Sequence, residues 1–285
     1  MEKKDIMIAA DSVCDLPDNI IEQYDIALIY HYVNTVAGKF LDREEITSDN
    51  IVDYFEKTSR GFDTLPPSVN DYEEFYKKCL KKSNKIIHVV MTKGSSKSYV
   101  NACDAAKKFD NVFVVNSKNV SVGYGMVVMK GAELCRTGMS AEKIVSELEE
   151  YREQIHFRFV MRSLENLHRC GRCPASVVEL TNFFKIHVDI RLKNDRMQVG
   201  RAYFGKMPWV YNQFVKTVFS SKNVDTSAVF VVTSGCTGKF IDGLRGQMAK
   251  YYKFDNTFVT KASSTVSCNC GAGAVGIAYA SFSVK

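Results

Sequence analysis

Short apolar runs alternate with amphipathic segments over the first 155 residues of the chain. Continuous apolar runs at 85–91 and 112–115 are typical of strands buried on both faces of a parallel sheet. The same pattern predicts further strands at 6–10 and 26–33, and helices at 51–58, 72–80, 98–107, 124–136 and 140–154. We expect the helix at 72–80 to begin with a capping box at Asn70–Glu73. This alternation predicts an α/β fold.

The pattern changes near residue 155. Strand-like segments then follow at 157–161, 188–191, 197–203, 228–232 and 257–259, with a helix predicted at 241–250 and a second helix of small residues from about Gly273. We therefore expect two α/β domains, at residues 1–155 and 156–285, with a parallel Rossmann-like sheet in the first.

Composition is that of an ordinary globular protein, with 46% hydrophobic and 25% charged residues among 285. No apolar run reaches the roughly eighteen residues that span a bilayer. The start, Met1–Asp5, leads directly into a predicted strand without the apolar core of a signal peptide. We expect a cytoplasmic protein without stable membrane insertion.

Positive charge is concentrated in one segment. Between Tyr151 and Arg201 ten Lys/Arg stand against five Asp/Glu, while the whole chain has a net charge of +6. Such a field attracts nucleic acid, phosphate ligands or an acidic protein, and the alternative is an ordinary solvated face. We expect no nucleic-acid partner, because the sequence has no helix-turn-helix, zinc-finger or aromatic RNA-binding signature.

The nine cysteines are odd in number and lie mostly inside predicted helices and strands, which favours free thiols over disulfides. Cys170 and Cys173 have C-x₂-C spacing, but Cys268 and Cys270 do not. The five histidines form no metal-binding motif, and no G-x-S-x-G motif is present. We expect no metal, no cofactor and no catalytic residues.

Two loops follow predicted strands, where open parallel sheets bind their ligands. Asp11–Leu16 is either such a ligand loop or a turn stabilised by its Asp and Ser side chains. In the loop Thr92–Ser98, the hydroxyls of Thr92 and Ser95 and the free N–H groups of the helix start are suited to a carboxylate or phosphate. Alternatively, a serine of this loop only caps the helix.

A G-x-G-x-x-G pattern occupies Gly271–Gly276. A dinucleotide site requires a further strand and an acidic residue about twenty positions on, and the sequence does not supply them. We expect these glycines, Gly271 among them, to let the backbone approach a ligand or the other domain.

Taken in order, these segments and several others resemble the DegV family of fatty-acid-binding proteins. The motifs that carry the resemblance are Asp11-Ser12 with Asp15, Thr64–Ser68, Ser95–Tyr99 with Ala102, Ser121 with Gly123 and Gly125, Leu164 with Leu167 and Gly171-Arg172, and Gly271–Gly276. Each is weak alone, but together they cover nearly the whole chain.

The resemblance implies a two-domain α/β fold that holds a long-chain fatty acid such as palmitate between its domains. It places the carboxylate ligands at Thr64 and Ser96, an arginine at Arg172, and Asn269 where the family has a histidine. Some members carry the acyl group for an ATP-binding fatty acid kinase subunit. The resemblance thus implies a non-enzymatic lipid carrier with no cofactor. An alternative hypothesis is an α/β enzyme that uses phosphate or a nucleotide at the loop Thr92–Ser98.

Overall fold

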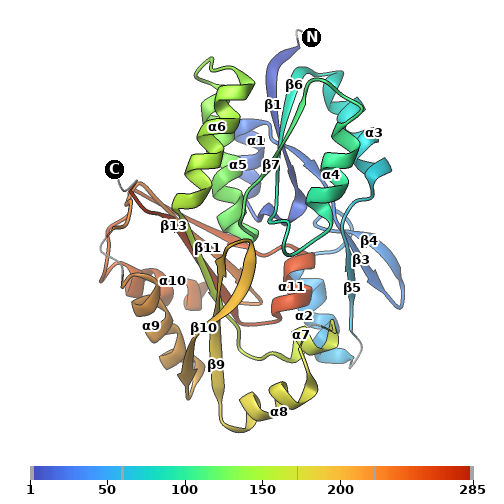
Figure 1. Cartoon of the computed structure of the whole chain (residues 1–285). Helices are drawn as coiled ribbons and strands as arrows, with labels where there is room; N and C mark the ends of the chain where they lie inside the picture. Colours follow the sequence, from blue (N-terminus) through green and yellow to red (C-terminus); the bar gives the residue numbers. More distant parts are fainter. Residues whose placement is uncertain (1–2, 59–60, 172, 221–222, 283–285) are drawn as a thin grey trace.

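The computed structural model describes residues 3–58, 61–171, 173–220 and 223–282, which form two α/β domains (Figure 1). The first domain contains a parallel sheet of order β2-β1-β6-β7. Its strands are β1 (Lys4–Asp11), β2 (Ala27–Ile29), β6 (Ser83–Val90) and β7 (Val112–Asn116), and its helices are α1 (Asp18–Tyr24), α3 (Val69–Leu80), α4 (Ser98–Ala106), α5 (Ser121–Cys135) and α6 (Ala141–Tyr151). The predicted α/β class and parallel first sheet are confirmed.

Helices cover both faces of this sheet, which explains its continuous apolar strands. On β1, Met7 and Ala9 pack in the cluster that contains Tyr72 and Tyr76 of α3. The alternate residue Ile8 packs in the cluster that contains helices α5 and α6. Successive side chains of a strand point to opposite faces, so every position of the strand interior is buried.

The second domain is built on a mixed sheet of order β10-β9-β8-β13-β11-β12. Its strands are β8 (Ile155–Val160), β9 (Ile186–Lys193), β10 (Arg196–Phe204), β11 (Ala228–Ser234), β12 (Asn256–Lys261) and β13 (Ala274–Ala280). Helices α9 (Met207–Val218) and α10 (Gly238–Met248) pack with β11 and β13 in a second apolar cluster. The other face of the sheet is turned toward the first domain.

Smaller elements lie between the two large sheets. The strands β3 (Tyr32–Thr35), β4 (Gly38–Leu41) and β5 (Asp63–Leu65) form an antiparallel sheet of order β4-β3-β5. Helix α2 (Ser48–Lys57) packs against α11 (Ser264–Cys270), and α11 in turn contacts α7 (Glu165–Arg169). Helix α8 (Ala175–Phe183) lies at the far end of the second domain (Figure 1).

Three predictions about local structure were wrong. The segment 26–33 is not one strand: β2 and β3 belong to different sheets and are separated by Tyr30 and His31. Helix α3 is capped by Ser68, whose hydroxyl accepts the Asp71 N–H at 3.2 Å, and not by Asn70. The helix expected from Gly273 is the central strand β13, which is buried throughout.

The small residues of β13 reflect the packing around the strand. A Cβ atom at Gly276 would lie 2.7 Å from Val232 and 2.8 Å from Phe157, both on neighbouring strands. Close neighbours on adjacent strands therefore require small residues in β13. In the sequence alone, this pattern is the same as that of a helix built of small residues.

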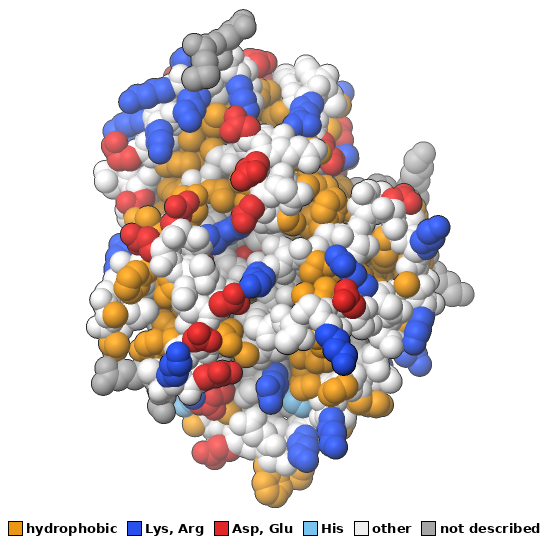
Figure 2. Space-filling model, turned by 180° about the vertical axis from the view of Figure 1, so that it is seen from behind, with side chains coloured by type: hydrophobic (Ala, Val, Ile, Leu, Met, Phe, Trp, Pro, Cys, Tyr) orange, Lys and Arg blue, Asp and Glu red, His pale blue; other side chains and the backbone are white. Residues whose placement is uncertain are grey.

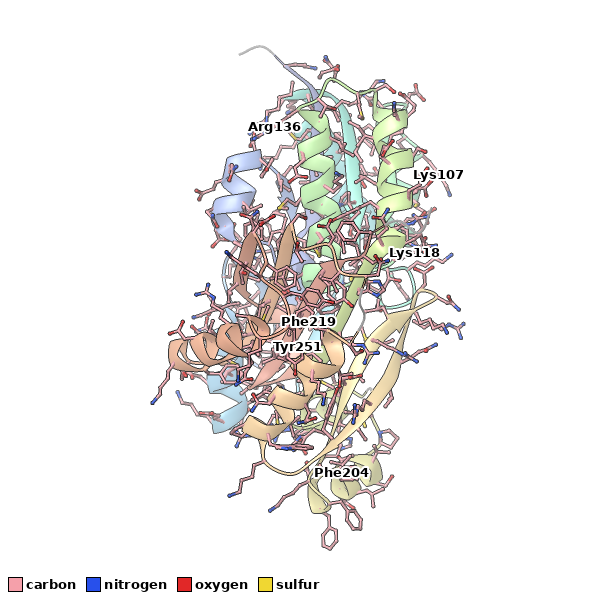
Figure 3. All side chains as sticks on the ribbon, turned by 90° about the vertical axis from the view of Figure 1, so that its left-hand side faces the viewer. Lys107, Lys118, Arg136, Phe204, Phe219 and Tyr251 are labelled. Atoms are coloured by element: carbon pink, nitrogen blue, oxygen red, sulfur yellow. The ribbon has the colours of Figure 1, made fainter. Side chains whose placement is uncertain are left out.

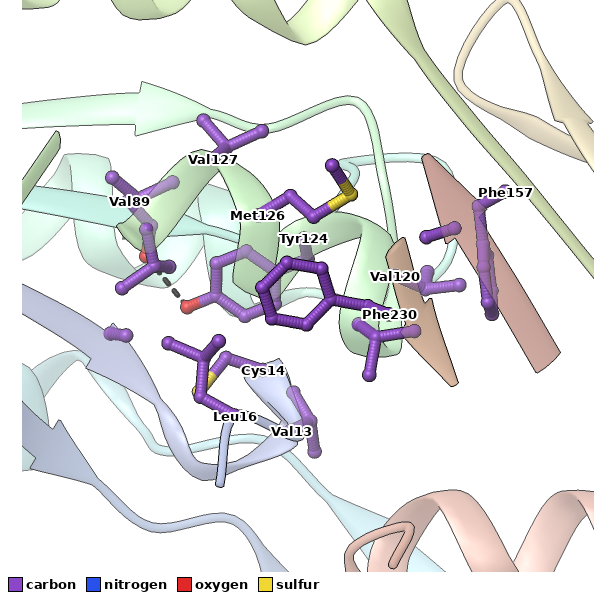
Figure 4. Packing of buried hydrophobic residues seen from close by; sticks show 14 of the residues in the cluster. Val13, Cys14, Leu16, Val89, Val120, Tyr124, Met126, Val127, Phe157 and Phe230 are labelled. Atoms are coloured by element: carbon purple, nitrogen blue, oxygen red, sulfur yellow. Dashed lines mark hydrogen bonds between the residues drawn. The ribbon is translucent and has the colours of Figure 1, made fainter. Parts of the chain in front are cut away.

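One apolar core extends across both domains. It includes Ile8 and Tyr124 of the first domain together with Phe157 and Phe230 of the second. Figure 4 shows Leu16, Met126 and Phe230 around Tyr124, whose hydroxyl donates to the Val89 carbonyl at 2.7 Å. The division at residue 155 stays a proposal, since a continuous core does not mark a boundary.

The surface carries charged side chains of both signs. Figure 2 shows lysine, arginine and acidic side chains interspersed over the face opposite that of Figure 1. Within the described residues, no helix is both long and apolar enough to cross a membrane.

Candidate functional site

A cavity of about 300 Å³ lies between the second-domain sheet and the first domain. This volume falls at the lower end of the range for small-molecule sites. Its walls are mostly apolar. The apolar lining comes from Val13, Met91 and Val120 on one side and from Phe157, Phe159, Ile190, Met197, Val199 and Val232 on the other. Such a lining suits a hydrocarbon chain.

Polar side chains reach the cavity where β3, β5, the turn before α4 and helix α11 meet. These residues are His31, Thr64, Ser95, Ser96, Thr265 and Asn269. Thr64 is on β5, opposite Val33 of β3. The structure therefore brings four residues singled out from the sequence, Thr64, Ser95, Ser96 and Asn269, to one wall.

Ser96 has two roles in this geometry. Its hydroxyl accepts the Ser98 N–H at 3.1 Å at the start of α4 and lies 2.9 Å from the Ser98 hydroxyl. It also lines the cavity. Capping and ligand contact were alternatives at the sequence level, and this geometry accommodates both.

Asn269 is held by a hydrogen bond within α11. Its Nδ2 donates one of its two hydrogens to the Thr265 carbonyl at 2.8 Å. Its Oδ1 is buried and has no hydrogen-bond partner among the described residues. A carboxylate only accepts hydrogen bonds, so the group of Asn269 able to bind it is the second Nδ2 hydrogen.

The remaining predicted residues lie elsewhere. Thr92 is fully buried and is not among the described residues that line the cavity. Gly271 lines a separate, more open groove of about 830 Å³ together with Arg162 and Lys185. Arg172 lies outside the described residues. Their predicted binding roles stay predictions.

A hairpin that the sequence did not single out covers the cavity. Strands β9 and β10 pair antiparallel, and Met197, Gln198 and Val199 of β10 line the cavity. In Figure 3 the hairpin runs along the side of the molecule, with Phe204 near its lower end and its turn near Lys118. The hairpin thus forms part of the enclosing wall.

The hairpin turn is fastened to the first domain through Asp195. The Thr92 hydroxyl donates to the Asp195 carboxylate at 2.8 Å, and Asn116 Nδ2 donates to the same oxygen at 3.1 Å. The Asp195 carbonyl lies so close to Gly94 that a Cβ atom there would be 1.8 Å away. Only glycine fits at this contact.

Asp11 organises the buried polar groups behind the cavity. Its carboxylate accepts from the Tyr72 hydroxyl at 3.0 Å and lies 3.2 Å from Nε2 of both His31 and His88. Burial opposes ionisation, but the hydrogen bonds and charge of His31 and His88 outweigh it, so the pKa of Asp11 is below its usual value. The carboxylate is therefore charged although it is fully buried.

Asp15 and Asp42 join the first domain to helix α11. Asp15 accepts the Ser263 N–H at 2.7 Å and the Ser121 hydroxyl. Asp42 accepts the Ser12 hydroxyl at 2.7 Å and the Ser264 hydroxyl. Burial raises the pKa of Asp15 to about 7 despite these hydrogen bonds. The loop Asp11–Leu16 thus positions α11, and its Val13 reaches the cavity.

None of the cysteines forms a disulfide bond within the described structure. Cys170 lies near Cys268, with its Sγ 3.5 Å from the Cys268 carbonyl oxygen, and Cys270 lines the cavity. Over the described ranges, no group of three or more His, Cys, Asp or Glu residues is positioned to hold a metal ion.

Comparison with protein families identifies this arrangement. Residues 5–281 match the family model described as "Uncharacterised protein, DegV family". The chain belongs to the DegV family. A DegV domain-containing protein of Clostridium perfringens is 35% identical over 200 residues, covering 68% of this chain and 70% of the relative. A Staphylococcus aureus DegV domain-containing protein is 24% identical over 95% of this chain and 97% of its own.

Solved DegV structures share the whole fold. A Thermus thermophilus DegV family protein described as binding fatty acid superposes with a TM-score of 0.86 at 24% identity, over 98% of this chain and all of its own. A Eubacterium eligens DegV family protein loaded with heptadecanoic acid has a TM-score of 0.84 at 17% identity, over 97% of this chain and 99% of its own. These similarities show that the two-domain DegV fold is present here.

Proposed function

We propose that this protein binds one long-chain fatty acid in the apolar cavity and carries it for lipid metabolism without catalysing a reaction. The observation that carries the proposal is the apolar cavity between the domains with a cluster of hydroxyl groups on one wall. Burying each methylene of an acyl chain contributes about 0.8 kcal/mol, so the chain supplies most of the affinity. The DegV proteins described with bound fatty acid support this proposal.

In this proposal the carboxylate is held by Thr64 and Ser96. Both hydroxyls can donate, and both residues line the cavity. Ser95 adds a third hydroxyl on the same wall. A carboxylate needs donors, which these hydroxyls supply.

The alternative enzyme, with a phosphate in the loop Thr92–Ser98, is disfavoured by the hairpin. The Thr92 hydroxyl already donates to the Asp195 carboxylate, and the Asp195 backbone covers Gly94. A phosphate entering this loop would displace the hairpin and meet a carboxylate of like charge. The same loop therefore serves as a docking point for the second domain.

A thermal-melting experiment separates the two functions. Protein stripped of lipid is melted alone, with palmitate, and with ATP and Mg²⁺. A fatty-acid carrier melts at higher temperature with palmitate only, because a ligand that binds the folded state stabilises it. A rise with ATP and none with palmitate would support the enzyme instead.

We also propose that the protein presents its acyl carboxylate to a separate ATP-binding kinase subunit. The excess of Lys and Arg between Tyr151 and Arg201 supports an acidic partner surface, since several of these side chains, such as Lys193, Arg196 and Arg201, are exposed. Pull-down from source-cell extract should recover a kinase subunit at low salt and less of it at high salt. Recovery that ignores salt would contradict a role for this charge.

A further inference from the structure

His31 is the one side chain able to carry positive charge among the described residues that line the cavity. It directly precedes β3 and is 3% exposed. A buried carboxylate needs hydrogen-bond donors and a nearby positive charge to offset its lost hydration. The hydroxyls of Thr64 and Ser96 supply donors but no charge. Only His31 can supply both.

The contacts of His31 leave one of its ring nitrogens available. Nε2 lies 3.2 Å from the Asp11 carboxylate and 3.2 Å from the Ser98 hydroxyl. Nδ1 forms no hydrogen bond within the described part of the chain. Because both neighbours lie at the same nitrogen, this is not the relay of a catalytic triad, in which the two ring nitrogens have different partners. The imidazole is instead anchored at Nε2, with Nδ1 free for a molecule in the cavity.

The second histidine on Asp11 has protein partners at both ring nitrogens. His88 Nε2 faces the other carboxylate oxygen at 3.2 Å, and its Nδ1 lies 2.7 Å from the Tyr76 hydroxyl. Of the two histidines, His31 is the one that lines the cavity.

We propose that His31, anchored at Nε2 by Asp11, donates a hydrogen bond from Nδ1 to the ligand carboxylate and supplies the positive charge beside it. This inference rests on the proposed fatty-acid binding and adds its electrostatic basis. His31 is a positioning and specificity residue, which selects an acid over a neutral lipid of the same length.

The test compares palmitate with hexadecanol, a neutral chain of equal length. His31→Gln weakens palmitate binding by about ten- to a hundredfold, the usual effect of losing a hydrogen bond to a charged group. It leaves hexadecanol affinity nearly unchanged, although it lowers the melting temperature because buried Asp11 loses a partner. His156→Gln, which alters an exposed histidine on β8, is the control and keeps the wild-type affinity for both lipids.

Two outcomes would overturn the inference: equal loss of palmitate and hexadecanol binding in His31→Gln, or unchanged palmitate binding in that variant. Failure of the wild-type protein to bind either lipid would instead overturn the proposed function. If His31→Gln does not fold, wild-type protein labelled with ¹⁵N in its histidines gives the same information. The Nδ1 signal of His31 shifts when palmitate binds and not when hexadecanol binds. A stationary signal contradicts the inference.

Discussion

At the scale of single residues, the two hydroxyl groups proposed to hold the carboxylate can be tested directly. Thr64→Ala and Ser96→Ala should each weaken palmitate binding by about 1–3 kcal/mol, because each removes a hydrogen bond to a charged group. Thr64→Ser keeps the hydroxyl and serves as the control. Isothermal titration calorimetry measures the affinities, and unchanged values in both alanine variants would contradict the head-group assignment.

The raised pKa of Asp15 predicts that the stability of the protein depends on pH. Its pKa in the folded protein is about 7, above the ordinary value of 3.8. The folded state therefore binds a proton more tightly than the unfolded state, and the stability that this contributes is lost as pH rises from about 4 to 7. Asp15→Asn removes this contribution.

Denaturant unfolding of both proteins at several pH values checks the prediction. The wild-type free energy of unfolding, relative to Asp15→Asn, should fall between pH 4 and 7 by more than about 1 kcal/mol, since one pKa unit corresponds to about 1.4 kcal/mol. Above pH 7.5 the difference should be constant. A difference that does not vary with pH, or that grows with it, would show that Asp15 is ionised throughout.

At the scale of elements, the β9–β10 hairpin controls access to the cavity in this account. Thr92→Val removes the hydroxyl that holds Asp195 while preserving the shape of the side chain. The loss of about 1 kcal/mol should increase the dissociation rate of bound fatty acid about fivefold. Thr260→Val, on the opposite edge strand β12, is the control.

Hydrogen exchange gives a readout of the hairpin that does not depend on lipid. The backbone amides of β9 and β10 should exchange faster in Thr92→Val than in the wild-type protein, because local opening requires less free energy. Exchange that is unchanged throughout the hairpin would contradict its fastening through Asp195.

The elements that the sequence predicted best are those with strong local signals. The continuous apolar runs of β6 and β7 identified buried parallel strands directly. The strand β13 was not predicted because its small residues are required by contacts with residues more than 40 positions away in the sequence, such as Val232 and Phe157. The periodicity of a short segment does not indicate such contacts.

The residues of the site also fall into those that the sequence predicted and those that it did not. Thr64 and Ser96 follow from the resemblance to the DegV family, and Thr92 stood out as one of several hydroxyls in a loop. His31 gave no signal because it fell inside an apparent single strand, and its partner Asp11 is 20 residues away. Asp195 contacts Thr92 across 103 residues. Residues that act through long-range partners can be recognised only once the chain is folded.

At the scale of the whole molecule, the domains are joined through one apolar core and the polar contacts of α11 and the hairpin. The cavity lies between them, so its occupant contacts both domains. A bound acyl chain would fill the space where the two layers meet and add apolar contacts to each. Lipid binding and the stability of the whole chain are therefore expected to rise together.

Native mass spectrometry of protein purified gently from its expression host tests the central claim most directly. The account predicts one long-chain fatty acid per chain, held non-covalently, because burying each methylene of the chain in an apolar cavity contributes about 0.8 kcal/mol. Organic extraction should return the same acid. A spectrum that contains only the bare chain, from a protein to which added palmitate also fails to bind, would contradict the account, as would a bound nucleotide in place of the lipid.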